Sequence, residues 1–475
     1  MKRYIKKSVF ALLFASLFVG CTKDFEEINT DPNNVTDVPT AYLMTQAQRS
    51  ILGQRFNTTS LLYSQQWSET QYTNTSRYQT AEASFNGFYT GPLADLEQII
   101  TINSDEATAS DATASGSNAN QIAVARILKV YTFQLITDVW GEIPYSDALR
   151  GSEAFKPTYD TQDAIYADFV TELTEAAAQI DVNAAGMEGD IIFGGDMAAW
   201  KKFANSLKAR VGIRMSEADA AAAQSAVVSG LAGGFESNAD NALFTYLADA
   251  ANWNPYYDHF LTRTDYAISN TLADYMAAIS DPRLPVYADP APNTGTVVGM
   301  PYGVSDAISG SITNAEISFP GIAVRSADSP GIMQTYSELL FIKAEAAARG
   351  WISDDPATVY EEAITASMEF WGIDEASIAD YLAQEAVAYD AANYKKSIGE
   401  QKWVSLYMDG QEAWSEWRRL DYPELAPAPA AYQDREIPRR RAYTQNEYDL
   451  NEENVKAAVS RQGEDAMETH IWWDK

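Results

Sequence analysis

The chain has 475 residues, and 46% of them are hydrophobic, as is typical of a folded globular protein and not of a disordered one. It contains 34 Lys and Arg against 66 Asp and Glu, so the formal charge is −32. A surface this acidic repels the phosphates of nucleic acids, and we therefore expect no DNA or RNA partner.

Residues 1–20 are predicted to form an export signal. The basic residues of its first part are Lys2, Arg3, Lys6 and Lys7. The apolar run Val9–Val19 that follows is too short to span a membrane, and Gly20 then precedes Cys21, the only cysteine in the chain. A cysteine directly after a cleavage site can take a diacylglycerol and an acyl chain such as palmitate, so we predict lipidation at Cys21. The alternative is an ordinary secretory peptide with a chance cysteine.

Residues 21–38 are predicted to be an extended, lipidated leader, because Asn and Pro interrupt any regular structure there. Residues 39–475 are predicted to form a single helical domain. Its region from about 233 to 330 is rich in Gly, Pro and Asn and is expected to be a loop-rich insertion with one short helix near 269–279.

Apolar residues recur at helical spacing through most of the remaining chain. Asp196 is the expected N-cap of one helix. Its buried face is expected to carry Trp200, Phe203, Leu207 and Val211, while Lys201, Lys202, Lys208 and Arg210 lie largely off that face. The expected helices are 39–62, 122–139, 163–180, 196–211, 218–231, 332–349, 356–371, 394–408 and 411–420, with a last helix that begins at Asn451. The pattern predicts a mainly α-helical fold, with tetratricopeptide-like helix pairs, long irregular loops, and few or short strands.

Motifs for catalysis are missing from the sequence. It has two histidines and no His-Glu-x-x-His, no cysteine pair, no Gly-x-Ser-x-Gly and no phosphate-binding glycine loop. We therefore predict a binding protein that is not an enzyme, with no cofactor and no assigned metal ligands; a structural calcium ion stays open. A lipid-anchored glycoside hydrolase stays open as an alternative, since such an enzyme needs only two carboxylates.

Two loop segments combine aromatic rings with amide and charged side chains. The candidate ligand-binding residues are Trp67, Tyr72 and Tyr78 in segment 65–78, and Trp253 and Tyr257 in segment 252–263. A Trp or Tyr ring covers the apolar face of a sugar, and neighbouring polar groups bind its hydroxyls. The same residues suit a peptide, and packing in the core is the structural alternative for each ring.

Several segments, in order along the chain, carry a family pattern: residues 21–33, Ile136–Leu149, Trp200–Arg210, Asp281–Pro285, Glu400–Arg419 and Ile437–Arg441. They resemble the SusD/RagB family of outer-membrane lipoproteins. The acidic stretch directly behind Cys21 also resembles the tag that directs lipoproteins of the Bacteroidota to the outer face of the outer membrane. Together these segments span nearly the whole chain.

The resemblance implies a tetratricopeptide-like scaffold without catalytic activity. It implies a partner, a SusC-like TonB-dependent transporter in the cell outer membrane, over which the lipid-anchored protein captures nutrients on the extracellular side. Ligands of the family are usually glycans, and in some members peptides. The resemblance does not assign individual ligand residues in the variable loops.

Overall fold

The computed structural model describes residues 38–55 and 58–474. The predicted signal 1–20, Cys21 and all but the last residue of the predicted leader lie outside these residues. Residues 40–475 group into one compact unit. Among the described residues, no helix combines the length and the apolar character needed to cross a membrane.

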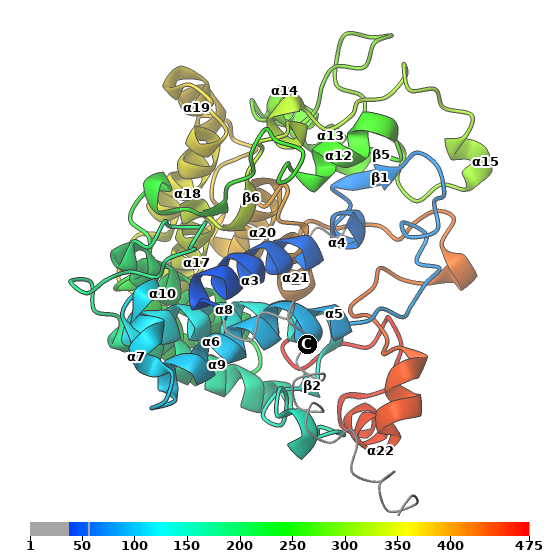
Figure 1. Ribbon diagram of the computed structural model, residues 1–475. Helices are drawn as coiled ribbons and strands as arrows, with labels where there is room; N and C mark the ends of the chain where they lie inside the picture. Colours follow the sequence, from blue (N-terminus) through cyan, green and yellow to red (C-terminus); the bar gives the residue numbers. More distant parts are fainter. Residues whose placement is uncertain (1–37, 56–57, 475) are drawn as a thin grey trace, which may run out of the picture. The chain divides into compact units, whose positions relative to one another are not determined.

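Helices account for most of this unit (Figure 1). The longer helices are α3 (Thr40–Arg55), α6 (Ala94–Ser104), α8 (Asn118–Trp140), α9 (Gln162–Gln179), α10 (Met197–Arg214), α11 (Ala220–Leu231), α12 (Pro255–Thr262), α13 (Asn270–Ala278), α17 (Tyr336–Ala348), α18 (Pro356–Phe370), α19 (Glu375–Leu382), α20 (Tyr394–Ser405), α21 (Gly410–Leu420) and α22 (Gln445–Gln462). The short ones include α4 (Thr58–Tyr63), α5 (Asn86–Phe88), α7 (Ala109–Ala112), α14 (Leu284–Tyr287), α15 (Asp306–Ser309) and α16 (Ile322–Arg325).

Side-chain caps explain where several of these helices begin. Asp196 accepts hydrogen bonds from the backbone N–H groups of Ala198 and Ala199 at the start of α10, as predicted. Ser117 caps α8 and Thr335 caps α17 in the same way. Each cap satisfies N–H groups that have no partner within the helix, and this fixes the first turn.

Helices that follow one another in the chain pack as pairs: α8 with α9, α10 with α11, α17 with α18, and α20 with α21. Figure 1 shows α10, α17 and α18 on one side of the unit, while α12, α13 and α14 gather near its upper end. This arrangement confirms the prediction of a mainly helical scaffold of paired helices.

The strands of the described residues form three two-stranded sheets. The strands are β1 (Trp67–Glu69), β2 (Ile143–Pro144), β3 (Tyr159–Asp160), β4 (Ala242–Phe244), β5 (Tyr266–Ile268) and β6 (Gly331–Gln334). They pair antiparallel as β1 with β5, β2 with β3, and β4 with β6. The first pair matters most for the candidate site, because it joins two loop segments that lie about 200 positions apart in the sequence.

One prediction about α10 is wrong in detail. Trp200, Phe203 and Leu207 are buried as predicted, but Lys208 and Arg210 are buried too. Arg210 donates to both carboxylate oxygens of Glu338 on α17, and this ion pair compensates the guanidinium for the loss of water. Lys201 is exposed, as predicted, so protein covers the charged side of α10 only further along the helix, at Lys208 and Arg210.

Candidate functional site

The aromatic segment 65–78 pairs through β1 with β5, which follows shortly after the other aromatic segment, 252–263. Trp67 pairs with Ile268 and Glu69 pairs with Tyr266. One step further, the backbone N–H of Thr70 donates to the carbonyl of Asp265 at 2.8 Å. The ladder thus sets residues 67–72 beside α12 and the turn that follows it.

Trp67 lies in the core beneath this region and not at its surface. Its side chain is fully buried, and its Nε1 donates to the hydroxyl of Tyr407 at 3.1 Å. Its ring lies 5.0 Å from that of Tyr256 and 5.9 Å from that of Tyr266. A ring enclosed by aromatic neighbours has no free face for a ligand, so the prediction that Trp67 stacks on ligand is corrected to a role in the core.

Tyr78 is also a core residue. It is fully buried, its ring lies 6.0 Å from that of Tyr63, and its hydroxyl accepts a hydrogen bond from the N–H of Ala428. Burial raises the pKa of Tyr78 to about 12. Its assignment to a ligand surface is corrected for the same reason as that of Trp67, because no part of its ring reaches solvent.

Tyr72, by contrast, is 66% exposed. Its backbone has a φ of 56°, a left-handed conformation that costs a residue with a side chain about 1 kcal/mol or more. The next residue is held in place, because the N–H and hydroxyl of Thr73 both donate to Asp306 at 2.9 and 3.1 Å. The guanidinium carbon of Arg263 lies 5.9 Å from the centre of the Tyr72 ring.

Asp265 organises the polar groups around Tyr72. The side chain of Gln71 donates to its Oδ1 and that of Arg263 donates to its Oδ2. The Nε2 atom of His259 lies 3.9 Å from Oδ2. Burial lowers the pKa of His259, and the nearby Arg263 lowers it further against the opposing effect of Asp265. Sequence reasoning missed Asp265, because only the fold brings it to Gln71.

Trp253 and Tyr257 form a second aromatic group at the start of α12. Both are half-buried, and their rings lie 5.2 Å apart at an angle of 65°. Between them, Asn254 caps α12 by accepting from the N–H of Tyr256, and its Nδ2 donates to the carbonyl of Ser329 at 2.8 Å. The cap holds the pair at a fixed place on the surface of the protein.

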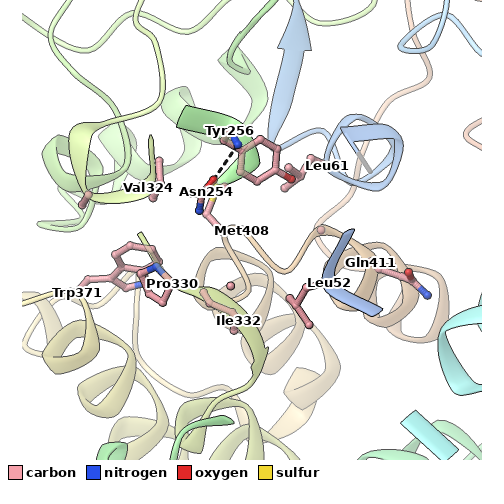
Figure 2. A pocket seen from close by; sticks show the side chains of 13 residues that line it. Leu52, Leu61, Asn254, Tyr256, Val324, Pro330, Ile332, Trp371, Met408 and Gln411 are labelled. Atoms are coloured by element: carbon pink, nitrogen blue, oxygen red, sulfur yellow. Dashed lines mark hydrogen bonds between the residues drawn. The ribbon is translucent and has the colours of Figure 1, made fainter. Parts of the chain in front are cut away.

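A small apolar cavity lies beneath α12 (Figure 2). Its lining includes Leu52, Leu61, Tyr256, Val324, Ile332, Trp371 and Met408. It leaves about 40 Å³ for the centres of water molecules, which is room for a few waters and too little for a sugar ring. We therefore place the candidate site on the outer surface, at Tyr72 and at the Trp253–Tyr257 pair.

The chemistry of this surface is that of binding. It offers aromatic faces beside amide and guanidinium donors, the combination that covers and hydrogen-bonds a polyhydroxylated ring. Within the part of the chain that the structure describes, no group of three or more His, Cys, Asp or Glu side chains is placed to hold a metal ion.

Comparisons with known proteins agree with this fold. The SusD-like family, described as "starch-binding associating with outer membrane", matches residues 32–444. A solved chitin-binding protein is 28% identical, with a TM-score of 0.80 over 92% of this chain and 100% of that one. A SusD homologue from Bacteroides fragilis is 26% identical, with a TM-score of 0.78 over the same shares.

A chitin-binding SusD homologue from Flavobacterium johnsoniae has the same fold at 24% identity, with a TM-score of 0.76 over 92% of this chain and 97% of that one. Among curated proteins, none matches. Because the family match covers most of its length, the chain belongs to the SusD-like family.

Proposed function

We propose that this protein captures glycans at the outer face of the outer membrane and delivers them to a SusC-like TonB-dependent transporter. The observation that carries the proposal is the exposed ring of Tyr72 and the half-buried Trp253–Tyr257 pair, set among hydrogen-bonding side chains. The family description and the chitin-binding relative at 28% identity support a carbohydrate ligand.

The proposal includes a lipid anchor at Cys21 and no catalytic step. Cys21 follows an export signal, and lipidation there would keep the domain beside its membrane partner. Cys21→Ala is expected to release the protein from membranes of cells that lack the transporter. Continued attachment of this variant in those cells would contradict the anchor.

Binding is tested on the purified domain by calorimetric titration with chitohexaose, maltohexaose and a mixed peptide library. Tyr72→Ala and Trp253→Ala are expected to weaken glycan binding by about 1–3 kcal/mol each, the scale of a lost stacking contact. Tyr42→Ala is the matched control, since Tyr42 on α3 is 69% exposed and lies outside the two segments. Its affinity should equal that of the wild type.

The two alternatives give different results in the same experiment. Binding of peptides without binding of any glycan would replace the glycan by a peptide ligand. If incubation of the protein with a glycan produces new reducing ends, and if removal of one carboxylate abolishes them, the protein is a hydrolase. Native mass spectrometry of the complex taken from its own membrane would identify both the transporter and the bound ligand.

A further inference from the structure

Asp265 is a buried carboxylate whose partners are exposed. It is 7% exposed, whereas Gln71 is exposed and the side chain of Arg263 is 50% exposed. Burying an anion is costly unless it is paired and hydrogen-bonded, so the two donors that satisfy Asp265 are held firmly by it. Asp265 thereby fixes two side chains that would otherwise move freely in solvent.

The fixed donors keep hydrogen-bonding capacity for a ligand. Arg263 uses its Nε toward Asp265, and within the described residues no hydrogen bond of its two Nη groups is found. Gln71 uses one hydrogen of its amide and retains its Oε1. The guanidinium of Arg263 lies 5.9 Å from the centre of the exposed Tyr72 ring, and Gln71 directly precedes Tyr72 and shares Asp265 with Arg263. A sugar bound at that ring would meet these donors.

Asp265 also cancels the charge of Arg263. Segments 67–78 and 255–268, together with Asp306, carry four carboxylates and two guanidiniums: Glu69, Asp258, Asp265 and Asp306 against Arg77 and Arg263. Arg77 is engaged elsewhere, because its Nε donates to the carbonyl of Ala430 at 2.7 Å. The surface therefore presents donors without net positive charge, on a chain whose formal charge is −32.

We infer that Asp265 is a positioning residue that makes this surface select uncharged glycans over anionic ones such as uronic acid polymers. The inference rests on the proposed function and adds the ligand class to it. A hydroxyl pair can bind the fixed Nη groups without any change in charge. A carboxylate would meet a guanidinium that is already neutralised, inside an acidic surface that repels it.

The test compares maltohexaose, cellohexaose and chitohexaose with hexagalacturonate by calorimetric titration. Wild-type protein is expected to bind the best of the neutral probes at least about tenfold more tightly than hexagalacturonate. Asp265→Asn should weaken neutral binding by about tenfold, the effect of one to two lost hydrogen bonds, and should strengthen binding of hexagalacturonate. The ratio of the affinity for neutral glycans to the affinity for hexagalacturonate therefore falls. A merely structural role of Asp265 would not lower this ratio.

Arg263→Gln shifts the same ratio in the opposite direction. It removes the cation and keeps an amide that can donate to Asp265, so neutral binding weakens and discrimination against hexagalacturonate grows. Asp258→Asn is the control, since it removes one carboxylate from the exposed surface of α12 without touching Gln71 or Arg263. It should leave neutral binding unchanged.

Each outcome bears on one of the two proposals. If wild-type protein binds hexagalacturonate as tightly as the neutral probes, the inference fails while glycan capture stands. If Asp265→Asn folds and keeps the wild-type ratio, the inference also fails. If no probe binds wild-type protein, the proposed function fails and the inference falls with it.

Discussion

Arg214 on α10 and Glu412 on α21 are 198 positions apart in the chain, and their side chains meet in an ion pair of 2.5 Å. The side chain of Arg214 is fully buried and that of Glu412 is 6% exposed. Further buried pairs continue from it: Arg214–Glu416, Lys402–Glu416, Arg419–Glu416, Arg419–Glu345 and Arg210–Glu338. The network joins α10, α17, α20 and α21, so the C-terminal helices are tied to the middle of the chain.

Removing Arg214 is expected to destabilise the protein strongly. Arg214→Met leaves the carboxylates of Glu412 and Glu416 buried with one partner fewer, and breaking such a pair costs about 3–5 kcal/mol. Urea unfolding followed by circular dichroism measures the change. Lys456→Met is the control, because the Lys456–Glu452 pair on α22 is more than 60% exposed on both sides and contributes about 0.5 kcal/mol or less. Equal losses in both variants would contradict the structural role of the network.

This network also marks the limit of what the sequence predicts. Helix α10 is predictable from its cap and its apolar spacing, because both signals are local. The burial of Arg210 is not, since its partner Glu338 lies 128 positions away and a charged residue on a helix is ordinarily in solvent. Only the assembled fold shows which charged side of the helix is covered.

The same reasoning explains the mixed outcome for the aromatic residues. The polar composition around Trp67 suggested a loop at the surface, but its Ser and Gln neighbours are buried. The Nε2 atom of Gln66, for example, donates to the carbonyl of Trp403 at 2.7 Å. The strand partner that buries Trp67 lies some 200 positions away. Tyr72 stays exposed because the ladder ends before it and its backbone turns into the left-handed region.

Trp67 and Tyr72 are therefore expected to differ when they are truncated. Trp67→Ala removes a fully buried ring and should lower the free energy of unfolding by about 3–5 kcal/mol. Tyr72→Ala removes an exposed ring and should change it by about 0.5 kcal/mol or less, while glycan affinity falls. Denaturant unfolding and glycan titration on the same samples separate the two effects. A large loss of stability in Tyr72→Ala would assign this ring to packing.

Trp253 and Tyr257 are expected to act as one unit in ligand binding. Their rings are in contact at 5.2 Å, so removing either one changes the surface that the other presents. In a double-mutant cycle with Trp253→Ala and Tyr257→Ala, the coupling in binding free energy should be about 0.5–1.5 kcal/mol. A parallel cycle with Trp253→Ala and Tyr42→Ala should give no coupling. Additive losses in the first cycle would mean that the two rings contact the ligand independently.

The two histidines of the chain are expected to titrate on opposite sides of their ordinary pKa of 6.5. Burial lowers the pKa of His259. The hydrogen bond to the carboxylate of Asp474, whose Oδ1 lies 3.3 Å from Nδ1 of His470, raises the pKa of His470. Proton NMR of the two imidazole signals measures both values, and His259→Gln assigns them. If both signals titrate with the same pKa, the lowered pKa of His259 and the raised pKa of His470 are both contradicted.

These shifts predict opposite contributions to stability. His259 takes up a proton less readily in the folded state than in the unfolded state. It therefore stabilises the folded state above pH 6.5, and this stabilisation is lost as the pH falls below 6.5 through the lowered pKa. His470 binds its proton more tightly when folded, so its contribution is present below pH 6.5 and is lost as the pH rises through its raised pKa. Relative to wild type, His470→Gln should therefore be less stable at about pH 5.5 than at about pH 8, and His259→Gln should show the reverse trend. Urea unfolding at the two pH values decides the sign, and parallel pH profiles for both variants would overturn the assignment of the two shifts.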